Sequence, residues 1–182
     1  MAILKIARMG HPVLKLTAVG VADPTDRKIV ALVDDMIATM QDASGTGLAA
    51  PQVHVPLRVV VFKVHPNRAE DGEDGVPLTV LINPEIEPLS DEKSLGWEGC
   101  LSLPDMMGEV ARFTHIRYWA YDLNGHRFER EAHGYHARVV QHECDHLDGI
   151  LYPYRIENMD YFGFNQELSR SLSDAQDDEH DG

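Results

Sequence analysis

Five consecutive residues near the end of the chain, His142-Glu143-Cys144-Asp145-His146, have the types and spacing of a metal site. Two histidines four positions apart lie on one side of a helix, where both imidazoles can reach the same ion. A glutamate directly after the first histidine is placed to carry protons for a water molecule at that ion. The pattern is short, so a helix with two hydrogen-bonded core histidines is the alternative interpretation.

The residues around this pentapeptide indicate a helix that turns the histidines inward. Cys144 projects roughly opposite the two histidines and is therefore a poor ligand of the same ion. Ligand-type and apolar residues recur at helical spacing along one stripe, which comprises Val139, His142, Glu143, His146, Leu147 and Ile150. The outer face of this helix is expected to carry Arg138, Gln141, Asp145 and Asp148.

A catalytic site of this kind takes three protein ligands and leaves a position for water. Downstream, the extended zincin pattern continues through Gly149 but has Tyr152 where a third histidine would stand, which leaves Glu157 or Glu167 as an alternative ligand. Upstream, Cys100 lies in a short run between Gly96 and Pro104. A thiolate with two imidazoles suits Fe(II) or Zn(II). Cys100 is therefore favoured over the downstream glutamates, although most free cysteines are simply small buried hydrophobes.

The elements that must position these residues indicate an α+β fold, with mostly antiparallel strands packed around a central helix that carries the histidines, and with an N-terminal helix. The N-terminal helix is expected to open at Asp23-Pro24-Thr25, with Pro24 in its first turn, and to end near Ser44-Gly45. Strands are expected at 58–63 and at 79–83, the latter stopped by Pro84 with Ile86 as a candidate to continue the pairing beyond it. A hairpin of 109–122 with 126–133 is also expected, with an acidic loop at 65–77 and a short amphipathic piece at 160–172.

The composition is that of an ordinary globular protein. The chain has 182 residues, 43% of them hydrophobic and 25% charged, which suits one domain. We expect residues 1–170 to form a single catalytic domain and residues 171–182 to be an acidic, disordered tail. No signal peptide and no membrane-spanning run is visible, and two cysteines are too few for a disulfide framework. A cytoplasmic protein is therefore expected.

The charge balance argues against a nucleic-acid site. Thirty acidic residues oppose 16 lysines and arginines, for a formal net charge of −14. Binding to a phosphate backbone depends on lysine and arginine, so no direct nucleic-acid site is predicted. The acidic clusters at 70–74 and 174–181 are interpreted as solvated segments.

A third stretch has the small residues that a close backbone approach requires. In Gly45-Thr46-Gly47-Leu48-Ala49-Ala50-Pro51-Gln52, a helix is expected before the glycines and a strand after them, so a dinucleotide loop is excluded. The three stretches GTGLAAPQ (45–52), EGCLS (98–102) and HECDH (142–146) resemble the signature motifs of the peptide deformylases, in the order and spacing of that family. Asn83-Pro84 and HLDGILYP (146–153) are similar to it as well, and the resemblance covers about residues 3–164.

The resemblance implies a role for each matching residue. Cys100, His142 and His146 would bind one divalent metal ion, Fe(II) in most bacterial members, with zinc, nickel or cobalt as substitutes. Glu143 would act first as general base and then as general acid. Gln52 and the backbone N–H of Leu101 would stabilise the oxyanion, and Gly47 would hydrogen-bond the main chain of the substrate. The implied reaction is hydrolysis of the formyl group from N-formyl-methionyl nascent peptides.

Two departures from the family pattern bear on partners. Met107 lies where many members carry an arginine, which puts substrate affinity in question but not the chemistry. Residues 160–182 contain one arginine, Arg170, and end in acids, so ribosome docking through a basic C-terminal helix is not expected, and only transient contact is retained. Two other interpretations stay open: an HExxH metallopeptidase with a downstream glutamate ligand, and a non-catalytic relative whose metal has four protein ligands.

Overall fold

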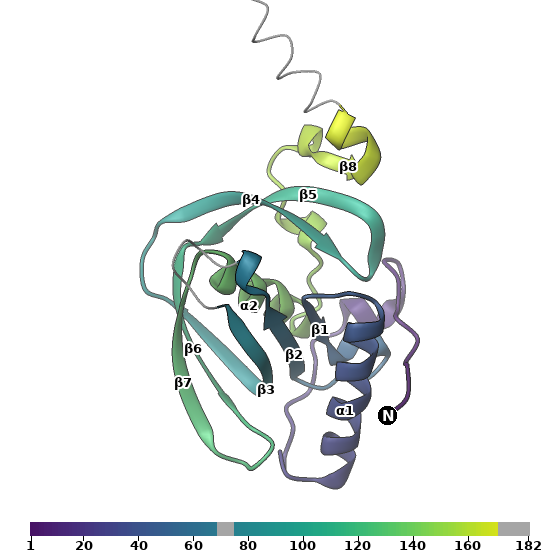
Figure 1. Ribbon diagram of the computed structural model, residues 1–182, viewed down its shortest axis with the longest axis vertical. Coiled ribbons are helices and arrows are strands. Elements are labelled where there is room, and N and C mark those ends of the chain that lie inside the picture. Colours follow the sequence, from purple (N-terminus) through teal and green to yellow (C-terminus); the bar gives the residue numbers. More distant parts are fainter. Residues whose placement is uncertain (69–74, 171–182) are drawn as a thin grey trace, which may run out of the picture.

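Two antiparallel sheets enclose one helix, α2 (Gly134–Leu147), which carries both histidines of the pentapeptide (Figure 1). The computed structural model describes residues 1–68 and 75–170. The fold is α+β and built of antiparallel strands around a central helix, so the predicted fold class is confirmed.

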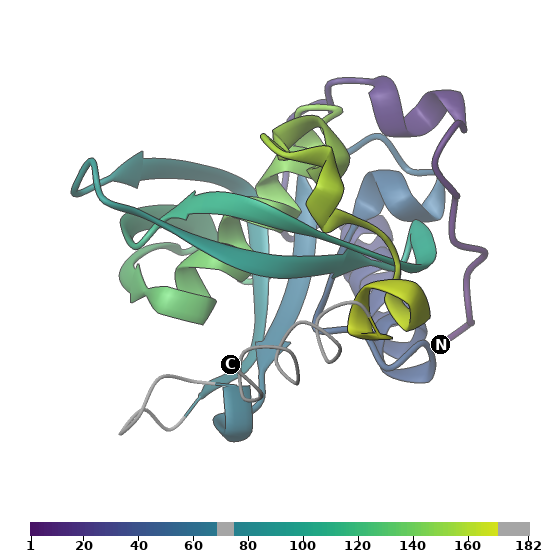
Figure 2. The same ribbon diagram turned by 90° about the horizontal axis from the view of Figure 1, so that it is seen from above.

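The larger sheet has the strand order β1-β2-β3-β6-β7, and the smaller sheet has the order β4-β5-β8. Figure 2 shows the long β4–β5 hairpin crossing over α2, on the other side of the helix from the larger sheet. The larger sheet comprises β1 (Gly47–Ala49), β2 (Val59–Val64), β3 (Val76–Pro88), β6 (His115–Tyr121) and β7 (Arg127–His133). The smaller sheet comprises β4 (Lys93–Cys100), β5 (Leu103–Phe113) and β8 (Phe162–Phe164).

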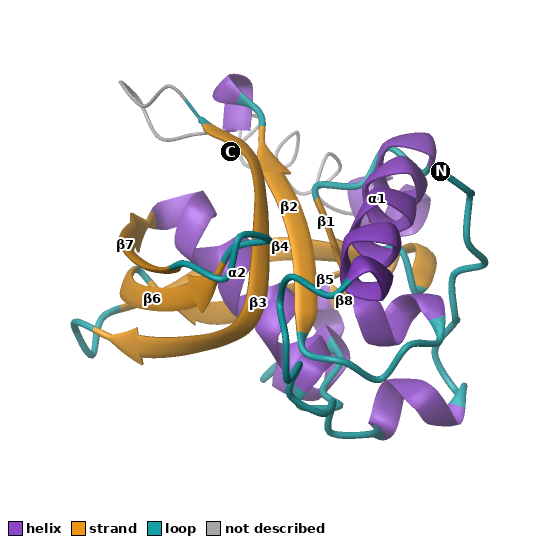
Figure 3. Ribbon diagram, turned by 90° about the horizontal axis from the view of Figure 1, so that it is seen from below, coloured by secondary structure: helices purple, strands orange, loops and turns teal. Residues whose placement is uncertain are grey.

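Strand β2 of the larger sheet is buried on both faces, and its alternate side chains point to opposite sides of the sheet. Val60 and Phe62 of β2 pack in the cluster that contains Val140 of α2. Val59 and Val61 pack on the opposite face with helix α1 (Arg27–Asp42), which lies against β1 and β2 (Figure 3). Short 3-10 helices occur at Pro12–Lys15, Ala50–Val53, Pro66–Arg68, Tyr152–Arg155 and Met159–Tyr161.

Helix α2 has no polar outer face, and here the sequence prediction is wrong. Every residue from His136 to Leu147 is buried, including Arg138, Gln141 and Asp145, although Asp148 is exposed as expected. The second sheet covers the face that was expected to meet solvent. Residues of this sheet supply hydrogen-bond partners for the polar side chains of α2. Gln141, for example, donates to the carbonyl oxygen of Phe113 in β5 at 2.9 Å. The polar residues at helical spacing in α2 therefore occupy buried positions where they form hydrogen bonds, and not a solvent-exposed face.

The predicted N-terminal helix is confirmed, but its start is not. Helix α1 begins at Arg27, and the carboxylate of Asp26 caps it by accepting a hydrogen bond from the Lys28 N–H at 2.8 Å. Pro24 therefore precedes the helix instead of occupying its first turn. The carboxylate of Asp23 makes an Asx turn with Thr25 that holds this preceding segment.

Two strand predictions need correction. Strand β3 does not stop at Pro84 but runs on to Pro88, across an irregularity between Ile82 and Glu85 where Asn83 has a φ of 52°. Such a bulge is one of the places where a sheet accepts proline. The segment expected as one strand at 109–122 is divided between β5 and β6, which lie in different sheets. The remainder of that prediction, the hairpin with 126–133, is confirmed.

The acidic cluster at 70–74 and the acidic tail at 171–182 lie outside the described residues. The description resumes at Gly75, just before β3. The amphipathic piece expected at 160–172 includes β8 and a helical segment at 165–170. No helix in the described part of the chain is long and apolar enough to cross a membrane.

Candidate active site

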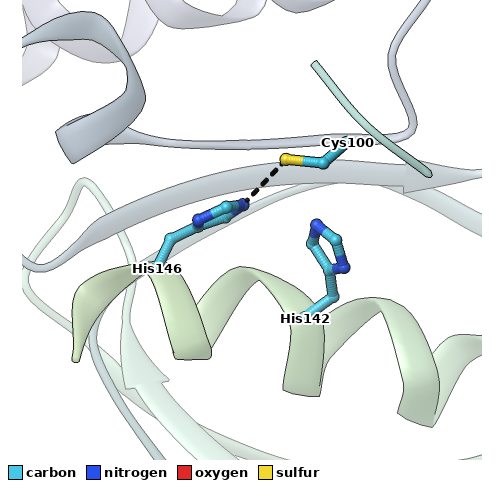
Figure 4. Close-up of side chains that lie close together, drawn as sticks. All are labelled: Cys100, His142 and His146. Carbon is cyan, nitrogen blue, oxygen red and sulfur yellow. Dashed lines mark hydrogen bonds between the residues drawn. The ribbon is translucent and has the colours of Figure 1, made fainter. Parts of the chain in front are cut away.

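Cys100, His142 and His146 converge on one space between the end of β4 and helix α2 (Figure 4). Their ligand atoms all lie within 4.8 Å of one another, and Cys100 Sγ is 3.3 Å from His146 Nε2. A sulfur and a nitrogen bound to one zinc ion at about 2.3 and 2.0 Å in tetrahedral geometry lie about 3.5 Å apart. The side chains of this triad are therefore already close to the spacing that a metal ion requires.

The local structure explains how residues 42 positions apart in sequence meet. A register shift between Gly99 and Cys100 breaks the regular pairing of β4 with β5 just before the two-residue turn Leu101–Ser102. Bulges of this kind redirect a side chain, and here Cys100 faces α2. Two N–H groups, Gln52 Nε2 and the Ser102 backbone, each donate to Cys100 Sγ at 3.4 Å and hold the sulfur in this position.

Both imidazoles are set to present one nitrogen to the shared space. His142 Nδ1 donates to Glu98 Oε2 at 2.8 Å, which turns Nε2 toward the shared space. Burial opposes the charge of His142, but hydrogen bonds with Cys100 and Glu98 outweigh it and raise the His142 pKa well above 6.5, so a metal ion would displace a proton from this ring. Burial holds the pKa of His146 well below 6.5, so its ring is neutral, the form that binds a metal. The residues present therefore fit one divalent ion of the zinc or iron class.

Glu98 anchors a buried network of charges beneath the triad. Its carboxylate receives two hydrogen bonds from Arg112, at 2.8 and 2.9 Å, and one from Arg138 at 3.0 Å. Arg112 also contacts Asp145 Oδ2 at 2.6 Å. Burial opposes the charge of Glu98, but hydrogen bonds from Arg112 and His142 outweigh it and hold the Glu98 pKa well below 4.5. A carboxylate held in this way orients the His142 ring.

Glu143, like His146 at Nδ1, has a buried polar atom without a hydrogen-bond partner among the described residues. Its side chain is 5% exposed, and its Oε2 atom has no hydrogen-bond partner among the described residues. Burial raises the pKa of Glu143 to about 7, although His142 acts in the opposite direction. A carboxyl group with a pKa near neutrality can both accept and release a proton.

The glycine-rich stretch forms the wall opposite Glu143. Gly47 opens β1 so close to this side chain that a Cβ atom there would overlap the Glu143 carboxyl group. Gln52, 1% exposed, accepts the Ala49 N–H at 2.9 Å and directs its own N–H₂ group toward Cys100 and Ser102. Leu101 follows Cys100 in the turn, and its side chain lies where a Cβ on Gly45 would meet it at 2.8 Å. The structure thus brings Gly47, Gln52 and Leu101 to the triad.

A cavity of about 470 Å³ opens over these residues. Met107 lines it, at the position where the sequence lacks an arginine. Two arginines, Arg68 and Arg138, also line the cavity. Arg138 is buried against Glu98, whereas Arg68 is exposed and hydrogen-bonds the Tyr135 hydroxyl at 2.9 Å. Arg68 is therefore the exposed cation of this wall among the described residues.

The competing ligands are not brought to the site. Glu157 and Glu167 are exposed, and neither belongs to the triad's cluster. Tyr152 is buried with its ring stacked on His142 at 6.1 Å between centroids, so it packs against a ligand. Cys144 lies in the hydrophobic cluster with Val140, where burial raises its thiol pKa.

Sequence reasoning missed the groups that hold the site in place. Glu98 was recognised only as part of a motif, and Arg112, Arg138 and Asp145 were not connected with the histidines. The available signal was position: Glu98 lies two residues before Cys100, in the same motif. Its arginine partners come from β5 and α2, and nothing in the local sequence links these elements.

Comparison with known proteins agrees with this geometry. The family model described as polypeptide deformylase matches residues 3–161. The chain is 52% identical over 163 residues to peptide deformylase 1 of Bordetella pertussis, covering 90% of this chain and 93% of that protein. It is 50% identical over 171 residues to peptide deformylase 2 of Ralstonia nicotianae, covering 90% and 97%.

Solved structures show the same likeness. A class I type b peptide deformylase from Acinetobacter baumannii with Met-Ala-Ser bound has a TM-score of 0.77 at 38% identity, covering 85% of this chain and 100% of that one. The peptide deformylase of Ehrlichia chaffeensis in complex with actinonin has a TM-score of 0.80 at 33% identity, covering 96% and 98%. With the matching residues converging as described, the chain belongs to the polypeptide deformylase family.

Proposed function

We propose that this site removes the formyl group from the N-terminal formyl-methionine of newly made polypeptides. The observation that carries the proposal is the convergence of Cys100, His142 and His146 beside a buried glutamate with an unpartnered oxygen. Such a set combines three candidate metal ligands with a proton carrier, the combination used in metal-assisted hydrolysis of an amide. Membership of the polypeptide deformylase family supports the same reaction.

Cys100, His142 and His146 would hold the metal ion. A divalent ion bound there would lower the pKa of a water molecule and polarise the formyl carbonyl. We further propose Fe(II) as the resident ion, with zinc, nickel and cobalt as functional substitutes, because a thiolate and two imidazoles suit all of these metals.

Glu143 is proposed to carry the proton. Its carboxylate takes a proton from the attacking water and later gives it to the amino nitrogen as the C–N bond breaks, so that formate and a free methionyl amine are the products. Gln52 is assigned to the developing oxyanion because its N–H₂ group already lies 3.4 Å from Cys100 Sγ. The backbone N–H of Leu101, the next residue along, is assigned the same task.

The substrate main chain is proposed to lie along β1. This strand is at the edge of the larger sheet, so Gly47 has backbone groups that no neighbouring strand occupies on its outer side. Trp97 and Gly99 of β4 line the opposite wall of the same cavity. An extended peptide could therefore add to the sheet edge, a common mode of peptide recognition. The Met-Ala-Ser peptide in the Acinetobacter relative supports a chain that begins with methionine.

Product analysis tests the proposal against a metallopeptidase on the same motif. The Fe(II)-loaded protein, kept anaerobic, should release formate from a formyl-Met peptide and leave every internal peptide bond intact. Cleavage of internal bonds without formate would overturn the proposal. Cys100→Ser should lose the metal, whereas Glu157→Gln should keep it, and the reverse result would move the third ligand downstream.

A further inference from the structure

A second group of metal-type ligands lies on the outer surface of the β6–β7 hairpin. His115, the first residue of β6, pairs directly with His133, the last residue of β7. Their rings stack with centroids 4.0 Å apart and planes inclined by 20°. Glu131 precedes His133 by two residues and therefore shares its face of the strand. The three side chains, hereafter the hairpin triad, thus stand side by side.

The distances within the hairpin triad suit a single ion. His115 Nε2 lies 3.1 Å from Glu131 Oε2, and one ligand atom from each residue lies within 4.8 Å of the other two. Two ligands at about 2.0–2.1 Å from a tetrahedral zinc ion lie about 3.4 Å apart. The His115–Glu131 pair, hydrogen-bonded at 3.1 Å, is close to this spacing. The His133 ring stacks on His115 and would have to rotate out of this stack to bring a nitrogen to the same centre.

The strand ends that carry the hairpin triad are held in place. The Gly134 N–H, next to His133, donates to the Thr114 carbonyl oxygen, next to His115, at 3.0 Å. His133 precedes α2 but makes no side-chain cap bond there, so its ring is not needed to start the helix. The strand ends are therefore preorganised, and the His133 ring is not committed to capping the helix.

The local charge also favours a cation. Arg117 donates to Glu131 Oε1 at 3.1 Å, which orients the carboxylate so that Oε2 faces His115. Arg117 also lies 3.1 Å from Glu129 and 3.9 Å from Glu87. Three carboxylates thus surround one guanidinium group and leave two negative charges in excess next to the two imidazoles. A negative field of this kind raises the local concentration of cations.

We propose that the hairpin triad binds a second divalent transition-metal ion of the zinc, nickel or copper class. Imidazole and carboxylate groups are ligands that these ions prefer, and solvent completes the coordination because Glu131 is half exposed. The site is separate from Cys100, His142 and His146 and stands independently of the proposed activity.

Zinc stoichiometry tests this site. The zinc-loaded protein is dialysed at neutral pH against a series of free zinc concentrations, and bound zinc per chain is measured by elemental analysis. The wild-type protein should rise from one to two equivalents. His115→Gln and His133→Gln should each keep the first equivalent and lose the second. Removing even an outer partner of a ligand weakens metal binding roughly 10–100-fold, so removing a ligand should weaken it at least tenfold.

The matched control is His126→Gln, which alters another exposed histidine at the turn of the same hairpin. It should retain two equivalents, because the hairpin triad is intact. Either of two results would overturn the proposal: a wild-type protein that saturates at one equivalent, or a second equivalent that persists in both His115→Gln and His133→Gln. The two variants are independent, so a folding defect in one leaves the other to decide.

Discussion

At the scale of single residues, we propose different roles for neighbouring side chains of α2: His142 and His146 bind the metal ion, and Glu143 carries the proton. Glu143 stands between the two ligand histidines on the helix but directs an unpartnered oxygen toward the cavity. The proposed ligands and the proposed proton carrier are therefore adjacent but distinct, and substitution can remove one without the other.

Glu143→Gln should keep the metal and lose turnover. The amide is nearly isosteric with the carboxylate but cannot accept the proton, and general acid–base groups typically contribute about 10²–10⁴-fold in rate. Metal content by elemental analysis and kcat on a formyl-Met peptide check this. Glu157→Gln, an exposed glutamate, should change neither quantity. A Glu143→Gln protein with nearly wild-type kcat would refute the assignment of the base.

Glu98→Gln should weaken metal binding and destabilise the fold. The substitution removes the negative charge that faces Arg112, Arg138 and His142. Loss of one partner of a buried ion pair costs about 3–5 kcal/mol, and loss of a partner that orients a ligand costs roughly 10–100-fold in metal affinity. Urea unfolding and a chelator competition measure the two effects. Glu85→Gln on exposed β3 surface is the control, and equal behaviour of the two variants would contradict the role of Glu98.

At the scale of elements, local signals sufficed for parts of the fold that local sequence controls. The hairpin turn after β6 has Asp122 and Gly125 to mark it, and the inward stripe of α2 is visible from its spacing. The burial of Arg138 and Asp145 was not predictable in this way. It depends on β4 and β5 covering α2, and on buried partners that come from other elements.

The candidate site divides in the same manner. The residue types and spacing of His142, Glu143 and His146 identified half of it, and the need for a third ligand favoured Cys100. The orienting role of Glu98 could not be derived, because it requires knowing that β4 passes over the helix. Asn83 shows a similar limit: its side chain bonds the Val21 backbone at 2.8 and 2.9 Å and holds the bulge that lets β3 pass Pro84.

The contact between β1 and α2 gives a prediction at this scale. Gly47→Ala would place a methyl group on the Glu143 carboxyl, so strand and helix must separate or Glu143 must turn away. A misplacement of about 1 Å can cost about 10²-fold in rate. We expect kcat/KM to fall by about that factor with full metal content. At Gly20 an added Cβ meets Asn83 at 3.6 Å, an ordinary contact, so Gly20→Ala should leave kcat/KM unchanged. Unaltered kinetics in Gly47→Ala would contradict the close approach.

At the scale of the whole molecule, one buried histidine outside the site should make stability depend on pH. His136 lies between Phe62 and Tyr118, and burial lowers its pKa to about 4 from 6.5. Between pH 4 and pH 6.5, His136 therefore binds a proton in the unfolded chain but not in the folded chain. The free energy of unfolding that the neutral His136 ring contributes is present in full above pH 6.5 and is lost as the pH falls toward 4. This loss is at most about 2 kcal/mol at pH 5.

His136→Gln should flatten this dependence, because glutamine does not titrate and still offers an acceptor for the Tyr118 hydroxyl. Urea unfolding at pH 7 and pH 5 gives the change in free energy for each protein. The loss between the two pH values should be smaller in His136→Gln than in wild type, whereas the exposed His126→Gln should match wild type. Equal losses in all three proteins would show that His136 is not the cause.

The central claim is that the assembled site hydrolyses a formyl amide at a methionine terminus. Its most direct test is formate release by the anaerobic, Fe(II)-loaded protein from a formyl-Met peptide, measured beside the acetylated peptide of the same sequence. We expect turnover of the formyl peptide and little or none of the acetyl peptide, because the additional methyl group would have to fit where Gly47 already lies close to the Glu143 carboxyl group. No formate from a protein that contains its full equivalent of Fe(II) would contradict it.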